Sequence, residues 1–298
     1  MRMSNLMFGS AIGLACVAML ASAGSAQRSI DERVPASPSG FVRIHNMGGS
    51  VKVRAWDRDT IAVTGSVWET KSDRFELHSG EGGAKLGLWN DTGEPVRPSA
   101  FEVRVPRGSH VWVKTASADI AIEGVRGGVD LYSVTGRITV TGDPREVFAE
   151  SMGGGIDISA NTRSVRAASA SGDIAVRGTI ADASVRTVSG DLVIEGSQFE
   201  RGRFESVEGD IRYAGEIGRS SLLDFVNHSG VVEFILPTKV AADFVVSTFE
   251  GGLDDRYGVR PESRLSKLKG SELTFTIGPG GGHVTVRNFK GRVVLRRK

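Results

Sequence analysis

The sequence has almost no cysteine, and this absence excludes several kinds of chemistry. Its one cysteine, Cys16, lies in an apolar stretch near the start of the chain. Without that stretch the chain would have no disulfide, no thiolate metal site and no cysteine nucleophile. Histidine is scarce as well, and the five histidines are scattered without metal-ligand spacing. We therefore expect a fold held by its apolar core and its backbone hydrogen bonds.

An excess of charge of one sign is also absent. The sequence has 37 Lys and Arg against 35 Asp and Glu, which gives a formal net charge of +2. This balance gives no reason to expect a nucleic-acid partner, and we predict none. Apart from the apolar stretch near the start, no run is long enough to span a membrane, so no transmembrane segment is expected after that stretch is removed.

The first 26 residues have the pattern of an export signal. Arg2 gives a positive start, Leu6–Ala21 is a nearly unbroken apolar run, and small residues continue to position 26. We therefore expect a signal peptide at 1–26 and an exported protein, either periplasmic or secreted to the cell surface. Residues 27–40, which contain Pro35 and Pro38, are expected to form a flexible leader.

One repeated block, V-x-V-x-[STN]-φ-x-G-x-[IVL]-x-[IV] with φ apolar, dominates the rest of the chain. Its marker, the apolar residue two positions after the glycine, recurs at Val51, Ile120, Ile138, Ile156, Ile174, Leu192, Ile211, Val232, Leu253 and Val293. The interval is 18 residues four times from Ile120 to Leu192. Apolar residues within a block are spaced by two, which indicates two short strands joined by a corner.

The period predicts an all-β fold, a parallel β-solenoid or β-helix-like stack of about ten short coils. Its repeat body would span residues 111–298, preceded at 41–110 by a first coil and an irregular β-rich cap. In that cap, Gly80, Gly82 and Gly83 indicate a hairpin turn. An antiparallel sandwich or propeller is the alternative fold, but the Asn-Gly and Asp-Gly turns that its hairpins would need do not recur.

Two columns of small residues mark the corners of the repeat. A glycine stands two positions before each marker, with Ala118 as the exception, and we expect positive φ there. A Ser, Thr or Asn stands five positions before each marker. We expect these side chains to satisfy backbone groups at the bend and to bond to the next coil. The column consists of Asn46, Thr115, Ser133, Ser151, Ser169, Thr187, Ser206, Asn227, Thr248 and Asn288.

Two passages carry a family likeness. They are FEVRVPRGSHVWVKTASADI at 101–120 and GGGHVTVRNFKGRVVLRRK at 280–298. Together with the S-G-D-I units they resemble the bacterial putative-adhesin β-repeat family, an uncharacterised domain of exported and envelope proteins. The resemblance implies surface attachment and supplies no catalytic residue. The chain departs from the family pattern at Ala118 and Arg137, where glycine and aspartate are common.

Three aromatic residues are the main candidates for binding. Trp112, Tyr132 and Phe148 fall at outward positions of the first strand in three successive units. If uncovered, they would form an aromatic patch suited to a sugar face or to a partner protein. If the irregular segment before residue 110 covers them, they would instead form a small local core.

Asp173, Asp191 and Asp210 share one column on adjacent coils, just before the marker. Carboxylates this close repel one another unless calcium or another cation neutralises them. They could also simply support the Gly-Asp corners, in which case no cofactor is needed. A glycan-cleaving β-helix enzyme, with two carboxylates as acid and base, is the catalytic alternative.

The segment from residue 287 is basic and contains no acid. It could be attracted to an anionic surface, or it could be a charged end cap that prevents pairing with another chain. The basic residues are Arg287, Lys290, Arg292, Arg296, Arg297 and Lys298. From these features we expect a non-catalytic structural or adhesin-like module of the bacterial envelope, with an envelope glycan or protein as its partner.

Overall fold

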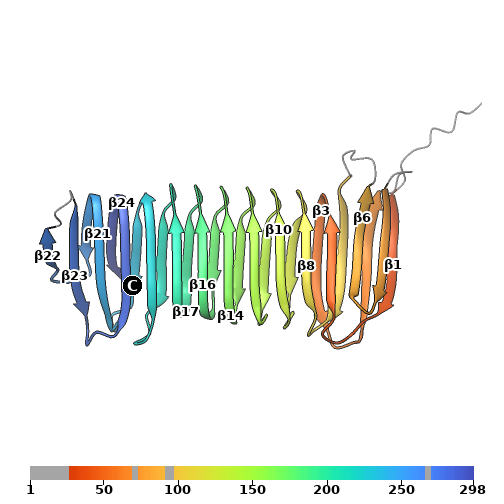
Figure 1. The fold of residues 1–298 in the computed structure, drawn as a ribbon, viewed down its shortest axis with the longest axis horizontal. Coiled ribbons are helices and arrows are strands. Elements are labelled where there is room, and N and C mark those ends of the chain that lie inside the picture. Colours follow the sequence, from red (N-terminus) through yellow and green to blue (C-terminus); the bar gives the residue numbers. More distant parts are fainter. Residues whose placement is uncertain (1–26, 69–72, 91–96, 266–269) are drawn as a thin grey trace, which may run out of the picture.

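The computed structural model describes residues 27–68, 73–90, 97–265 and 270–298. The expected signal peptide, with Cys16, lies outside the described residues. Figure 1 shows a straight rod of strands, with β1 (Gln27–Pro35) at one end and β22 (Glu262–Leu265) at the other. No helix is present in the part of the chain that the structure describes, so it holds no helix able to cross a membrane.

Each unit of the repeat supplies one strand to each of two stacks. The first stack contains β2 (Phe41–Asn46), β8 (His110–Thr115), β10 (Gly128–Ser133), β12 (Glu146–Ser151), β14 (Thr162–Ser169), β16 (Thr179–Thr187) and β19 (Leu222–Ser229). The second contains β3 (Gly49–Trp56), β9 (Asp119–Glu123), β11 (Ile138–Gly142), β13 (Ile156–Ala160), β15 (Ile174–Arg177), β18 (Ile211–Glu216) and β20 (Val232–Leu236). Three long strands turn a corner and belong to both, namely β17 (Leu192–Ser206), β21 (Ala242–Arg256) and β24 (Gly282–Arg297).

Neighbouring strands within each stack are parallel and in register. Ile138 lies opposite Ile156, which lies opposite Ile174. All ten markers continue this column, and all except Leu253 are buried in one apolar core. The β-branched residues that dominate the inward positions suit such a pleated, buried surface. The prediction of an all-β, solenoid-like stack is thus confirmed.

The two ends of the rod are built from antiparallel strands. At one end β1 pairs with β4 (Thr60–Trp68), β4 pairs with β7 (Ser99–Pro106), and β5 (Asp73–Gly80) pairs with β6 (Gly83–Asn90). At the other end β21 pairs with β23 (Ser271–Ile277), which pairs with β22. The hairpin expected near Gly80 and Gly83 is therefore present. Residues 27–35, which were expected to belong to a flexible leader, form strand β1.

Chain order and stacking order differ at both ends. The unit of β2 and β3 lies between the β8–β9 unit and strands β6 and β7, although β6 and β7 come between them in the chain. Similarly, β24 inserts between β21 on one side and β19 and β20 on the other. The units therefore stack in the order in which they occur in the chain only from β8 to β20.

The small polar column lies inside the bend of each unit. The Ser169 hydroxyl accepts a hydrogen bond from the backbone N–H of Gly172 at 2.8 Å. Thr187 accepts one from Gly190 at 3.2 Å and donates to the carbonyl of Gly172 in the preceding unit at 3.3 Å. These side chains are buried, so the bonds prevent the bend from leaving backbone groups unpaired.

Most of the corner glycines are needed for a reason other than positive φ. The positive φ expected from the sequence occurs at Gly49, Gly230 and Gly291, whereas Gly154 and Gly172 are outside the positive-φ region. A β-carbon added at Gly172 would lie only 2.2 Å from the carbonyl oxygen of Gly154 in the preceding unit. Positive φ also occurs at the second corner, with 115° at Gly142 and 122° at Gly178.

A candidate binding face of stacked aromatic rings

The three candidate aromatic residues form one row on the outer side of the first stack. The ring centroids of Trp112 on β8 and Tyr132 on β10 are 5.7 Å apart, and those of Tyr132 and Phe148 on β12 are 5.4 Å apart. All three side chains are half-buried. The structure therefore brings together the three residues singled out in the sequence, and they cover one another while part of each ring remains exposed.

Two further rings extend this row toward the β1 end of the rod. His45 on β2 lies 5.0 Å from Trp112 and 4.6 Å from Trp89 on β6, measured between ring centroids. We refer to Trp89, His45, Trp112, Tyr132 and Phe148 as the aromatic row. Trp89 was not predicted because the 18-residue period lapses there, and His45 was not predicted because the histidines suggest only a metal-binding role, for which their spacing is unsuitable. The alternation of apolar residues around His45 places its ring on the outer face of the strand, and this could have predicted that it belongs to the row.

Cations border the Trp89 end of the aromatic row. The Lys85 ammonium lies 3.9 Å from the centroid of the Trp89 ring, and the Arg43 guanidinium lies 5.5 Å from that of Trp112. Burial, together with the positive charges of Lys85, Arg43 and Lys114, lowers the pKa of His45 from 6.5 to about 4. At neutral pH His45 is therefore an uncharged ring within the row.

This low pKa predicts a pH dependence of stability. The unfolded chain takes up a proton on His45 below about pH 6.5, whereas the folded chain resists protonation down to about pH 4. Protonation of His45 in the unfolded chain therefore lowers the free energy of unfolding as the pH falls from 6.5 toward 4, and has no effect above about pH 6.5. We expect the melting temperature to fall more over this range in the native protein than in His45→Phe, which keeps the ring but does not titrate. Parallel melting curves of the two proteins would contradict this account.

The aspartate column bonds to the backbone of the next unit. The Asp173 carboxylate accepts a hydrogen bond from the N–H of Asp191 at 2.9 Å, and the Asp191 carboxylate accepts one from Asp210 at 2.8 Å. Asp210 accepts one from Val231 in the same way, at 2.8 Å. These oxygens thus join successive units, in addition to lying at a corner. Among the described residues no group of three or more His, Cys, Asp or Glu is arranged to hold a metal ion.

The basic segment is not a free tail. All its basic residues except Lys298 belong to β24, which lies inside the stack, and several of its cations have partners. Arg287 binds both carboxylate oxygens of Asp224, at 2.8 and 2.7 Å, and Arg296 pairs with Glu233. Lys290 lies 3.7 Å from Glu250. Charges expected to protect an exposed final strand instead pair across neighbouring strands.

A family profile described as Toastrack DUF4097 matches residues 42–295. The chain belongs to this family. The match covers both the aromatic row and the stack from β2 to β24, so both are parts of the Toastrack domain. A comparison with curated proteins found no match.

Several solved structures of bacterial proteins are similar to this Toastrack chain. A putative adhesin from Bacteroides fragilis is 12% identical with a TM-score of 0.46, and the alignment covers 92% of this chain and 99% of that one. A putative lipid binding protein from Parabacteroides distasonis is 11% identical with a TM-score of 0.48, covering 91% and 96%. A putative adhesin from Parabacteroides merdae is 6% identical with a TM-score of 0.46, again covering 91% and 96%. At such identities no functional residue can be transferred to this chain.

Proposed function

We propose that this Toastrack protein is a non-catalytic, adhesin-like binding module of the bacterial envelope. The signal pattern at 1–26 supports export to the periplasm or the cell surface. The proposed architecture is a parallel β-solenoid of about ten coils, with the first coil and a β-rich cap at 41–110, and its role is to hold a ligand-binding face rigid. The observation that carries the proposal is the unbroken, half-buried aromatic row from Trp89 to Phe148.

The proposed ligand is an envelope polysaccharide. The rings of the aromatic row recur along the rod axis at centroid separations of 4.6 to 5.7 Å. A polymer whose sugar rings also recur along one direction could contact several of them at once, burying apolar sugar faces against aromatic surface. Lys85, Arg43 and Lys114 supply hydrogen-bond donors for hydroxyl or acidic substituents beside the row.

The aspartates support a binding role more than a catalytic one. A glycosidase needs one carboxylate free to act as acid and another free to act as base or nucleophile. Asp173, Asp191 and Asp210 each accept a hydrogen bond from a backbone N–H of the next unit, so these carboxylates already have a structural role. The same arrangement is repeated in three units. An active site normally departs from the repeat at one place, and we therefore propose no reaction for this column.

A binding assay on envelope polysaccharides tests the proposal. Replacing Trp112, Tyr132 and Phe148 with alanine removes three neighbouring rings of the row, and we expect at least a tenfold loss of retention on cell-wall fractions. For soluble polysaccharides, affinity electrophoresis in gels containing the polysaccharide would measure the corresponding loss of affinity. The pair Phe249→Ala and Phe289→Ala is the control, because these rings are partly exposed elsewhere on the rod.

Equal retention of the native protein and the triple variant would refute the aromatic row as the binding face. Retention that disappears after protease treatment of the cell-wall fraction would indicate a protein partner. Circular dichroism must show that the triple variant is folded, since ring pairs of this kind contribute about 0.5–1.5 kcal/mol each. The single variant Trp112→Ala provides a milder test if the triple variant is unstable.

A further inference from the structure

Exposed apolar side chains gather at one position of the repeat. Among the described residues nine large hydrophobic side chains are exposed, and seven of them directly follow a residue of the small polar column. This is the φ position of the repeat pattern, for which the sequence alone indicates no role. The seven are Met47, Val134, Met152, Val188, Val207, Phe249 and Phe289. Because the units are stacked in register, these side chains form a stripe along the corner of the rod.

In the part of the rod from β16 to β23, the stripe becomes one wall of a groove. There the residues at the φ position are, in stacking order, Val188, Val207, His228, Phe289 and Phe249. Phe289 stacks on His228 and on Phe249, with centroids 4.9 and 4.7 Å apart and planes within 7° of parallel. The groove has a volume of about 700 Å³, which lies within the range of pockets for small organic ligands.

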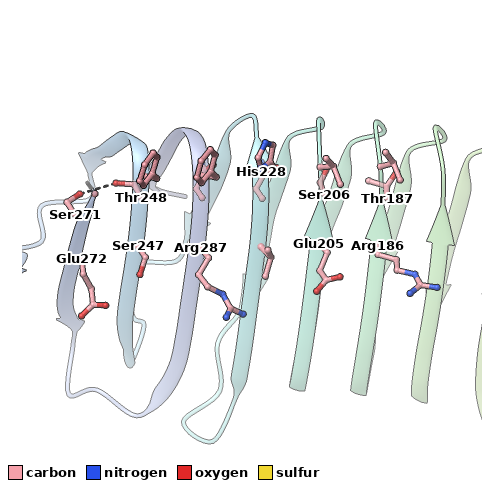
Figure 2. A pocket seen from close by; sticks show the side chains of 18 of the residues that line it. Arg186, Thr187, Glu205, Ser206, His228, Ser247, Thr248, Ser271, Glu272 and Arg287 are labelled. Atoms are coloured by element: carbon pink, nitrogen blue, oxygen red, sulfur yellow. Dashed lines mark hydrogen bonds between the residues drawn. The ribbon is translucent and has the colours of Figure 1, made fainter. Parts of the chain in front are cut away.

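The opposite wall consists of outward side chains just before the bend, and Figure 2 shows them in a row below the small polar column. Glu205 pairs with Arg203, and Arg287 pairs with Asp224, so both carry partnered charges. Arg186, at one end of the row, has no ion-pair partner among the described residues. Glu272 lies at the other end. Among the described residues, the groove is therefore apolar along one wall and has a cation without an ion-pair partner at one end.

We propose that this groove binds a long-chain carboxylate, with the acyl chain along the stripe and the carboxylate at Arg186. The five side chains from Val188 to Phe249 span four strand spacings, or about 19 Å, which suits an extended chain lying along the axis. Glu272 would repel the carboxylate from the opposite end, so the charges also determine the direction of the ligand. This site is separate from the aromatic row and does not depend on the function proposed for it.

A peptide is a poorer occupant of the groove than an acyl chain. The strands under the groove, from β16 through β17, β19 and β24 to β21, are each paired on both sides. They have no row of free backbone donors and acceptors for an added strand. A peptide lying along the apolar wall would leave its own backbone groups without partners, whereas an acyl chain has no such groups.

Displacement of a fluorescent fatty acid from the full-length protein tests the proposal. We expect 11-(dansylamino)undecanoic acid to bind with a rise in fluorescence and palmitate to displace it. Val207→Asp places a charge on the stripe inside the groove and should weaken palmitate binding at least tenfold. Met152→Asp is the matched control, since it makes the same kind of change at the same repeat position outside the groove, and it should leave binding unchanged. Arg186→Gln should weaken palmitate several-fold and hexadecanol hardly at all.

Three results would overturn the assignment. In the first, palmitate fails to displace the probe; in the second, Val207→Asp and Met152→Asp weaken binding equally. In the third, size-exclusion chromatography shows a dimer that Val207→Asp dissociates while palmitate has no effect, which would identify a second copy of the chain as the occupant. Because both substituted side chains are exposed in the native protein, the variants should fold, and melting curves would verify this.

Discussion

Removal of residues 282–298 is expected to unfold residues 242–277 while the units from 111 to 216 stay folded. Strand β24 lies between β21 and the pair β19 and β20, so its loss leaves β21 with β23 as its one partner among the described strands. Five buried apolar side chains disappear with it, namely Val284, Val286, Val293, Val294 and Leu295. At about 1.5–3 kcal/mol each, the local loss is roughly 8–15 kcal/mol, comparable with the whole stability of many domains.

Hydrogen exchange read by mass spectrometry would locate this unfolding. In a stack of units stability depends on contacts between nearest neighbours, so the damage should not spread along the whole rod. A chain lacking residues 27–35 is the control, because among the described strands β1 pairs only with β4, and it contributes one buried apolar side chain, Ile30. Slow exchange at 242–277 in the truncated chain would show that β24 is not the strand that holds this region.

The second large effect is expected from a single methyl group at a corner. In Gly172→Ala the new β-carbon would lie 2.2 Å from the carbonyl oxygen of Gly154, and relieving this clash requires two backbone segments to separate. We expect a loss of about 1–3 kcal/mol and a larger loss for Gly172→Val. Chemical denaturation would measure both.

A neighbouring glycine provides the control for this prediction. Gly153 is also outside the positive-φ region, and the nearest atom to an added β-carbon there is 3.7 Å away. Gly153→Ala should therefore change the stability by no more than about 0.5 kcal/mol. If both alanine variants lose the same stability, the close approach of Gly172 and Gly154 is not the reason for the glycine.

The regular part of the fold was predictable because equivalent residues in successive repeat units pair with one another. Residues at equivalent places in successive units, such as Ile138, Ile156 and Ile174, must lie opposite one another if each unit buries its apolar face against the next. The small polar column followed from the same reasoning. In both cases chemically similar residues recur at one position, and stacking places them side by side.

The order of the units at the two ends was not predictable from the pattern. The units marked by Leu253 and Val293 have the same alternation of apolar residues, and either could pair with the unit of Val232. In the structure Val293 occupies that place, and Leu253 lies beyond it. The corner glycines present a similar ambiguity, because glycine is favoured both by positive φ and by close backbone contact, and the sequence does not distinguish these causes.

The candidate site was predictable only in part. Trp112, Tyr132 and Phe148 stood out because they occupy outward positions in regular units. Trp89 comes from β6, in the irregular region, where no period shows which face a side chain occupies. The apolar stripe was visible in the repeat pattern itself. The groove was not, because the sequence does not show how the chain bends at the corner or which side chains form the opposite wall.

The interior position of β24 also constrains how the chain can assemble. All the strands that flank it are made earlier, yet β21 cannot join the growing stack until β24 arrives between them. Until residues 282–297 have been synthesised, β19 and β20 therefore keep an open edge, which in an unfinished sheet invites pairing with other chains. Completion of the rod thus depends on the last strand to be made, and the state that still lacks this strand is the one most exposed to aggregation.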